Sequence, residues 1–147
     1  FRLAYSYLKS AAEADDVTQN ALLKLYLTDK RFESEAHVKN WLYRVAANEC
    51  KRALLSPWRR AEDIADYAEA LAFTEPERSE LFYAVMELSA KYRAVIHLHY
   101  YEDYSTQEIA EILGIPAATV RTRLRRGREL LKKKLMEAEG YAGQENV

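Results

Sequence analysis

The chain has 147 residues, of which 49% are apolar and 31% are charged, a composition that predicts a soluble protein able to bury a core. With four Gly and three Pro, it lacks the turn residues of a fold with many strands. Its single cysteine, Cys50, excludes a disulfide scaffold and a cysteine-rich zinc site, and is typical of a reducing cytoplasm. No apolar run approaches the ~18 residues of a membrane span. The first residues show no signal peptide, and because the chain opens on Phe1 rather than Met, we expect its natural start to lie upstream.

The net charge of −1 conceals an uneven distribution of charges along the chain. Residues 1–60 carry a net charge of +4, 61–80 carry −6, 81–115 carry −3 and 116–136 carry +7. Two basic blocks separated by an acidic one indicate two polyanion-binding surfaces with a connector between them. Solvated helix faces whose charges happen to cluster would give the same pattern, and charge alone does not separate these interpretations.

Apolar periodicity predicts helices throughout, and no alternation of apolar and polar residues lasts long enough to indicate a strand. The expected fold class is all-α, with two small helical domains joined by an acidic linker. Pro57 should end the last helix of the first domain, because proline lacks an amide hydrogen and crowds the preceding turn. A frayed tail is expected from Gly140. The expected helices run over about 1–9, 13–28, 37–55, 77–88, 90–101, 105–113 and 117–137.

The helix expected over 13–28 has two apolar faces. One arc is wholly apolar and consists of Ala14, Val17, Ala21 and Leu25. The opposite arc mixes apolar and polar side chains, namely Asp16, Gln19, Asn20, Leu23 and Leu27. A helix of a small domain buries only one side against its own core, so the mixed arc is interpreted as a partner surface. A helix sandwiched between neighbours is the alternative.

The helix expected over 37–55 interleaves aromatic and basic side chains. Trp41 and Tyr43 lie among the bases Lys39, Arg44, Lys51 and Arg52, and Trp58, Arg59 and Arg60 follow. Such a pattern suits single-stranded nucleic acid, because bases stack on rings while Lys and Arg follow the phosphates. For Trp41 alone, a place in the core is favoured. Spacing does not explain why Glu49 falls inside the apolar arc of this helix.

The strongest local pattern lies between Ser105 and Lys134. Ser105 followed by Glu108 predicts a capping box that opens a helix, and Gly114 permits the left-handed backbone of a tight turn after it. In the next helix, Val120 and Leu124 begin an apolar stripe, and arginines occupy the opposite arc. This arrangement is a helix-turn-helix whose second helix presents bases where such a helix enters the major groove. Eight basic residues within 116–136 favour DNA binding over a generic helical hairpin.

These segments, in this order, resemble the sigma factors of bacterial RNA polymerase, specifically the extracytoplasmic-function (ECF) group. Residues 13–26 resemble the core-binding helix of conserved region 2, and 41–48 resemble the promoter-opening segment that follows it. Residues 104–116 with 119–124 closely match region 4. The resemblance covers nearly the whole chain, and the paired motifs are far more specific than the helix-turn-helix alone.

The resemblance implies region 2 over 1–60, a linker over 61–78 and region 4 over 79–139. Region 2 would bind the clamp helices of the largest polymerase subunit and the minus-ten promoter element. Region 4 would bind the flap of the second-largest subunit and the minus-thirty-five element. The implied function is promoter recognition, DNA melting and transcription initiation in the cytoplasm, with an anti-sigma factor as a further partner and without membrane insertion.

The site residues implied by the resemblance and the helix faces fall into three sets. The set for core polymerase comprises Asp15, Asp16, Gln19, Asn20, Leu23 and Leu27. The set for the minus-ten element comprises Lys39, Asn40, Arg44, Asn48, Lys51, Arg52, Trp58, Arg59 and Arg60. The set for the minus-thirty-five element comprises Ala118, Arg121, Thr122, Arg123, Arg125 and Arg126.

Two other functions compete with this interpretation. A stand-alone helix-turn-helix regulator would bind DNA as a dimer, but the sequence offers no convincing dimer seam. An enzyme would need chemistry that the sequence does not supply: the three histidines, His37, His97 and His99, have no metal-ligand spacing, and no glycine-rich phosphate loop occurs. We therefore expect no catalytic residues, no metal and no cofactor.

Overall fold

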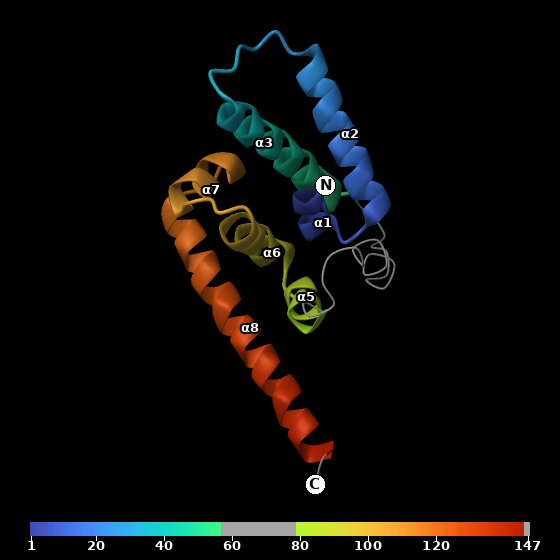
Figure 1. Ribbon diagram of the computed structural model, residues 1–147, viewed down its shortest axis with the longest axis vertical. Helices are drawn as coiled ribbons and strands as arrows, with labels where there is room; N and C mark the ends of the chain where they lie inside the picture. Colours follow the sequence, from blue (N-terminus) through green and yellow to red (C-terminus); the bar gives the residue numbers. More distant parts are fainter. Residues whose placement is uncertain (57–78, 146–147) are drawn as a thin grey trace.

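The computed structural model describes the backbone of residues 1–56 and 79–145, and the side chains of 1–56 and 80–140. Within these residues the protein is all-helical and has no strand. The N-terminal helices are α1 (Arg2–Leu8), α2 (Ala11–Leu27) and α3 (Glu35–Leu54). They are followed by α5 (Ser79–Met86), α6 (Ala90–Ile96), the π-helical turn η2 (His97–Tyr101), α7 (Thr106–Leu113) and α8 (Ala117–Glu145) (Figure 1). The predicted all-α fold with a C-terminal helix-turn-helix is confirmed.

Serine caps set the starts of α2 and α3 two residues earlier than the periodicity predicts. The hydroxyl of Ser10 accepts a hydrogen bond from the backbone N–H of Glu13 at 3.2 Å. The hydroxyl of Ser34 accepts one from the N–H of His37 at 3.1 Å. Each serine satisfies an amide that has no partner inside its helix. Apolar spacing missed both starts because the first turn of each helix is mostly polar or alanine.

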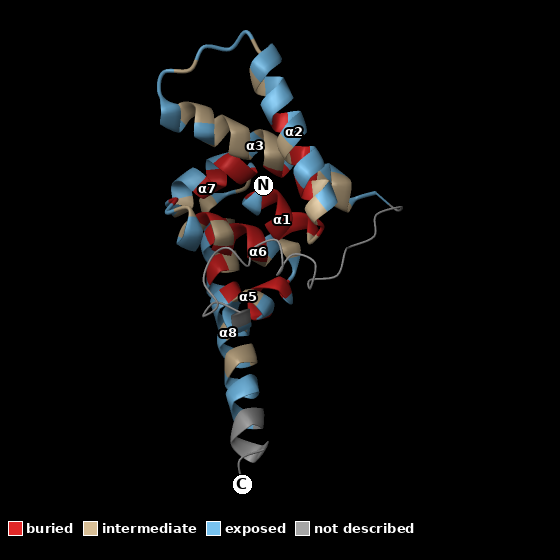
Figure 2. Ribbon diagram, turned by 45° about the vertical axis from the view of Figure 1, so that its right-hand side comes forward, coloured by how far each residue is buried: buried red, intermediate tan, exposed pale blue. Residues whose placement is uncertain are grey.

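The last helix is longer than predicted and corrects the expectation of a frayed tail. α8 continues through Gly140 to Glu145. No proline follows Gly140, and a single glycine costs a helix only about 1 kcal/mol relative to alanine. Both views show the C-terminal half of α8 extending beyond the other helices (Figures 1 and 2).

One buried core joins the two helical clusters. Every residue from 3 to 8 in α1 is buried, and α1 packs against α2, α3 and α6. The same cluster continues through Val95, Leu98, Ile109 and Val120, and Figure 2 shows the buried residues gathered where α1, α6, α7 and the first half of α8 meet. α3 also packs against α7. The two clusters are therefore in direct contact, while the predicted linker over 61–78 lies outside the described residues.

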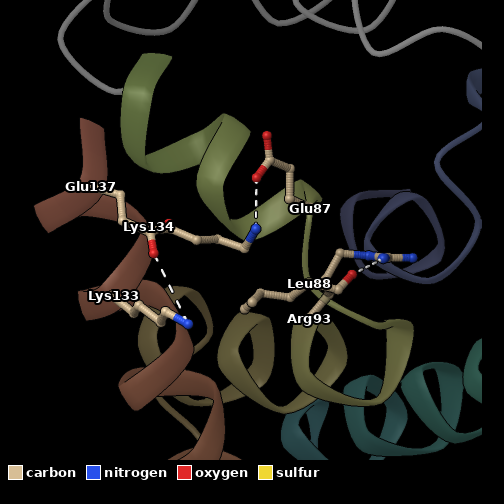
Figure 3. A network of polar contacts seen from close by, with 6 residues as sticks. All are labelled: Glu87, Leu88, Arg93, Lys133, Lys134 and Glu137. Atoms are coloured by element: carbon tan, nitrogen blue, oxygen red, sulfur yellow. Dashed lines mark hydrogen bonds and ion pairs between the residues drawn. The ribbon is translucent and has the colours of Figure 1, made fainter. Parts of the chain in front are cut away.

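Ion pairs at the rim tie individual helices together. Lys24 of α2 pairs with Glu49 of α3 at 2.7 Å, which explains the carboxylate inside the apolar arc of α3. In Figure 3, Lys134 of α8 reaches Glu87 at the end of α5 at 2.7 Å, and Lys133 pairs with Glu137 along α8. Lys134 therefore links α8 to the end of α5, and its ammonium group is paired with a carboxylate.

Candidate polymerase and promoter interfaces

The helix-turn-helix is formed by α7, Gly114 and the start of α8. The Ser105 hydroxyl accepts from the N–H of Glu108 at 3.2 Å, and the Ser105 N–H donates to the Glu108 carboxylate at 2.8 Å, so the predicted capping box is present. Gly114 has φ +65°, the left-handed conformation that ends α7. Val120 and Leu124 are buried. Their burial fixes which side of α8 is turned to solvent.

The recognition face of α8 consists of Ala118, Arg121, Thr122, Arg123, Arg125 and Arg126. All are exposed except Thr122 and Arg123, which are half-buried. The Thr122 hydroxyl donates to the carbonyl of Ala118 at 3.0 Å, and Arg125 lies 3.4 Å from Glu129. Five of these predicted residues, all except Arg123, thus lie together on one side of the helix, with only weak surface contacts restraining them.

An open cavity of about 500 Å³ lies beside the recognition face and includes residues outside the predicted DNA-binding sets. His99, Thr106 and Arg128 line it together with Arg121 and Arg125. Arg128 Nη1 donates to the Tyr100 hydroxyl at 3.0 Å. Arg128 follows Arg125 by three residues, and this helical spacing could have predicted that it lies near the recognition face. His99 lies in a different element, so only the fold brings it there.

The α3 basic face consists of Lys39, Asn40, Arg44, Asn48, Lys51 and Arg52. Arg44, Asn48 and Arg52 are exposed, and Lys51 is half-buried. Trp58, Arg59 and Arg60, predicted to extend this face, lie outside the described residues. Trp41 is half-buried, and its ring lies 5.5 Å from that of Phe32 in an edge contact. It belongs neither to the buried core nor to the hydrophobic residues packed against the core, so the place in the core favoured for it is not borne out.

Three bases of the α3 basic face contact the segment from η2 to α7. Arg44 donates to the carbonyl of Glu111 through Nε at 3.2 Å and through Nη2 at 2.6 Å. Lys51 Nζ donates to the carbonyl of Leu113. Lys39 Nζ lies 3.4 Å from the carboxylate of Glu102. These contacts were not foreseen, because two of the acceptors are backbone carbonyls.

The surroundings of these contacts shift several pKa values. Burial raises the pKa of Tyr43, and a hydrogen bond to Glu102 raises it further. Partial burial disfavours the charge of Glu102, but the Tyr43 hydroxyl, His97 and Lys39 together hold the pKa of this carboxyl below its usual value. Burial lowers the pKa of Lys51, and the nearby charge of Arg123 adds to that shift. Arg123 therefore lies on the side of α8 that faces α3.

The α2 outer face consists of Asp15, Asp16, Gln19, Asn20, Leu23 and Leu27, all exposed. Leu23 is 55% exposed and Leu27 is 67% exposed. Leu22 and Tyr26, 53% and 85% exposed, extend the apolar part of this surface beyond the predicted set. No described element covers it, so the alternative of a helix sandwiched between neighbours does not hold for the part of the chain that the structure describes.

The sequence matches known families along both helical clusters. Residues 1–60 match the family model for Sigma-70 region 2, and 78–131 match that for Sigma-70, region 4. The ECF RNA polymerase sigma factor SigW of Bacillus subtilis is 32% identical, and the alignment covers 93% of this chain and 83% of SigW. The chain belongs to the ECF sigma factors.

Other similarities agree with this family. The RNA polymerase sigma-H factor of Pseudomonas aeruginosa is 31% identical over 90% of this chain and 78% of its own length. The sigma factor RpoE of Bartonella quintana, solved in complex with the anti-sigma factor NepR, has a similar fold, with a TM-score of 0.61 and 24% identity over 92% of this chain and 88% of RpoE.

The predicted family and function are confirmed: the chain is an RNA polymerase sigma factor directing promoter recognition. The match to region 2 disfavours a stand-alone helix-turn-helix regulator. In this sigma factor, region 2 includes α1–α3, and region 4 includes α5–α7 and the first half of α8. Among the described residues, no three His, Cys, Asp or Glu side chains are grouped to hold a metal, and no helix is long and apolar enough to cross a membrane.

Proposed function

We propose that this ECF sigma factor works through three separate surfaces: the α2 outer face binds core polymerase, the α3 basic face binds the minus-ten element, and the recognition face of α8 reads the minus-thirty-five element. Region 2 ends with residue 60 and region 4 spans 79–139 in this proposal. The factor initiates transcription in the cytoplasm and, like sigma factors generally, has no enzymatic activity of its own.

The α2 outer face has the composition of a protein-binding surface. Exposed leucines occupy its C-terminal half, and Asp15, Asp16 and two amides occupy its N-terminal half. Exposed apolar anchors next to polar groups are typical of interfaces between proteins. The partner would be the clamp helices of the largest subunit, while region 4 would bind the flap of the second-largest subunit.

The α3 basic face offers cations to the phosphates of an opened strand. Arg52 and Asn48 are exposed, so their side chains can reach a strand that passes along α3. Trp58, Arg59 and Arg60 belong to this surface in the proposal, with Trp58 as a stacking platform for a base. These groups would hold the non-template strand during DNA melting.

The exposed arginine pair of α8 is the observation that carries the proposal. Arg121 and Arg125 are four residues apart, so they lie one turn apart, and both are exposed while Val120 and Leu124 are buried. A guanidinium there can form two parallel hydrogen bonds with guanine in the major groove.

An anti-sigma factor would be a further partner and would hold the protein inactive. The support for this partner comes from RpoE of Bartonella quintana, which has a similar fold and was solved in complex with the anti-sigma factor NepR.

Run-off transcription with purified core RNA polymerase on a library of promoter sequences tests the proposal. Adding the factor should give transcripts only from templates that share two elements, one near minus ten and one near minus thirty-five. Binding to DNA in the absence of core polymerase, with equal strength and the same sequence preference, would instead support a stand-alone regulator.

A further inference from the structure

One arginine of α8 next to the recognition face is held in place by a second element. Arg128 is exposed, and its Nη1 donates to the hydroxyl of Tyr100 in η2 at 3.0 Å. Arg125, one turn earlier in α8, is paired at 3.4 Å with Glu129 of its own helix, and these two side chains are 61% and 64% exposed. Arg128 is therefore tethered to η2, whereas Arg125 has a weak surface contact within α8.

Two further contacts fix the position of Tyr100. Its ring meets that of His99 edge to face, with 4.9 Å between the ring centres. His99 Nδ1 lies 2.9 Å from the carbonyl oxygen of Tyr104, and because a carbonyl only accepts, Nδ1 is the donor in this hydrogen bond. Tyr104 is buried. A chain of contacts therefore leads from the backbone of a core residue through two rings to the guanidinium of Arg128.

The backbone that carries these two rings has an unusual conformation. Residues His97–Tyr101 form a π-helical turn, and the N–H of Glu102 donates to the carbonyl of His97 at 3.2 Å. Asp103 follows with φ +57°, a left-handed conformation that few residues other than glycine adopt. Single π-helical turns and left-handed residues other than glycine are both frequent at functional sites. The backbone that positions Tyr100 thus has the features of a binding segment.

The cavity beside the recognition face has the chemistry of an anion site. Arg128 lines it together with Arg121 and Arg125, and none of the described lining residues is a carboxylate. A hollow lined by charges of one sign attracts ions of the opposite sign. His99 and Thr106 add polar groups at its wall. Because the cavity is open, a phosphate group that is part of a longer chain can enter it.

We infer that Arg128 binds one phosphate of the promoter backbone at the edge of the groove that Arg121 and Arg125 enter, with Tyr100 as its positioning residue. The inference rests on the proposed role of the recognition face in reading the minus-thirty-five element. The bond to Tyr100 uses Nη1, so Nε and Nη2 remain for two parallel hydrogen bonds to phosphate oxygens.

A tethered arginine next to two untethered ones gives a division of roles. A phosphate contact carries no sequence information but fixes the register and orientation of the protein on the duplex. Because Tyr100 holds Arg128 before DNA arrives, little side-chain freedom is lost when the phosphate binds. The bound phosphate then determines which base pairs Arg121 and Arg125 meet.

Holoenzyme binding to a promoter with single uncharged phosphates tests the inference. The promoter is one selected by run-off transcription, and each phosphate in and around its minus-thirty-five element is replaced in turn by a methylphosphonate. On the unmodified promoter, Arg128→Ala should weaken binding by about tenfold, as expected for hydrogen bonds between charged groups. One methylphosphonate should weaken binding of the native holoenzyme by a similar factor and leave that of Arg128→Ala unchanged.

Three further variants separate positioning from charge. Tyr100→Phe removes only the hydroxyl and should weaken binding by about two- to tenfold through the same phosphate, since Arg128 must then be ordered on binding. Arg128→Lys keeps the charge without the planar fork and should recover part of the loss. Lys132→Ala removes an exposed cation one turn further along α8 and should weaken binding equally with and without that methylphosphonate. A variant that failed to fold would also lose affinity for every duplex equally.

The outcomes distinguish this inference from the proposed function. If Arg121→Ala weakens binding but no methylphosphonate removes the difference between Arg128→Ala and the native chain, the phosphate contact is wrong and the recognition face stands. If Arg121→Ala has no effect either, the proposed role of the recognition face is wrong.

Inorganic phosphate, compared with sodium chloride at equal ionic strength, tests whether a free anion uses the site instead. For a contact to DNA, both salts should displace the promoter from native and Arg128→Ala holoenzyme to the same relative extent. If phosphate displaces it selectively from the native holoenzyme and no methylphosphonate position depends on Arg128, the ligand is free phosphate and the assignment to DNA is wrong.

Discussion

Individual arginines on α8 have different surroundings, which assigns them different roles. Arg121, Arg125 and Arg126 are exposed, whereas Arg123 is half-buried and its charge acts on Lys51 of α3. A base-reading side chain must be free to extend into the groove, and a phosphate contact needs only to reach the edge of it. We therefore expect half-buried Arg123 to contribute less to DNA binding than the exposed arginines.

The exposed arginines should differ in the kind of defect that their loss causes. We expect Arg121→Ala and Arg125→Ala each to lose discrimination at one or two minus-thirty-five positions, by about 1–3 kcal/mol, because each removes a pair of hydrogen bonds to one base. Arg126→Ala is the matched control: it should weaken all promoters equally and reduce the salt slope by roughly one. Transcription from a library of minus-thirty-five variants measures both. Uniform loss from Arg121→Ala and Arg125→Ala would contradict the assignment of base contacts.

We expect the stability of the fold to depend on pH through His97. Its ring is largely buried, stacks on Tyr101 at 5.6 Å and lies 3.4 Å from Glu102, and burial lowers its pKa although Glu102 opposes the shift. The unfolded chain regains a pKa near 6.5 and so binds this proton more readily than the folded chain. The stabilisation that comes from neutral His97 is therefore present above about pH 6.5 and is lost as the pH falls below that value.

We expect the free energy of unfolding to decline between about pH 7 and pH 5, and His97→Phe to flatten this decline because phenylalanine keeps the ring stacking and does not titrate. Urea denaturation at a series of pH values gives the slope. If the free energy of unfolding of His97→Phe declines with pH as steeply as that of the native chain, another group causes the decline.

At the scale of the helix, α2 packs with one side and turns the side proposed to bind core polymerase to solvent. Ala14, Val17 and Ala21 are buried against the rest of region 2, while the leucines of the α2 outer face are exposed. Removing a side chain that is already in water changes the folded and unfolded states almost equally, so stability barely responds. Removing the same side chain does weaken binding if that side chain is an anchor at an interface.

Leu23→Ala should therefore weaken binding to core polymerase by about 1–2 kcal/mol and leave the free energy of unfolding within about 0.5 kcal/mol of the native value. Val17→Ala should show the reverse, with a loss of stability of about 1 kcal/mol or more from the cavity that it leaves. Titration of labelled protein with core enzyme and urea denaturation measure the two quantities. Parallel losses of binding and stability in Leu23→Ala would place this residue in the core.

At the scale of the whole molecule, the shared core makes regions 2 and 4 dependent on each other. Arg93 belongs to region 4 and serves carbonyls of both halves, those of Ser6 and Tyr7 in α1 and that of Leu88 before α6 (Figure 3 shows the last). A planar guanidinium can donate in several directions at once, which an ammonium group cannot do with the same geometry.

Arg93→Lys should cost about 1–3 kcal/mol, because buried carbonyls lose their donors, and both halves should unfold together. Far-ultraviolet circular dichroism follows the whole chain, and the fluorescence of Trp41 follows region 2 alone when Trp58 is replaced by Phe. Coincident curves are expected. Separate transitions in the native chain would show that the halves fold independently.

Local patterns in the sequence were enough to predict the helices, the helix-turn-helix, the exposed set on α2 and most of the exposed residues on α8. Each depends on residues within one or two turns of each other: Ser105 with Glu108, Gly114 at the turn, and Arg121 with Arg125. Capping bonds, backbone conformation and helical periodicity act over that range. The predicted end of α8 and the predicted starts of α2 and α3 were less accurate, because caps and single glycines shift a helix boundary at small energetic cost.

The contact of α3 with α7 was decided only by the tertiary structure. Arg44 and Lys51 bond to carbonyls more than 60 residues away, and every residue type carries the same carbonyl. No spacing of side chains in the sequence encodes such a partner. His99 and Arg128 meet in one cavity for a similar reason, since they belong to η2 and α8. Contacts between distant elements arise from how the apolar faces of α1, α6 and α7 pack together, and that packing depends on the whole core at once.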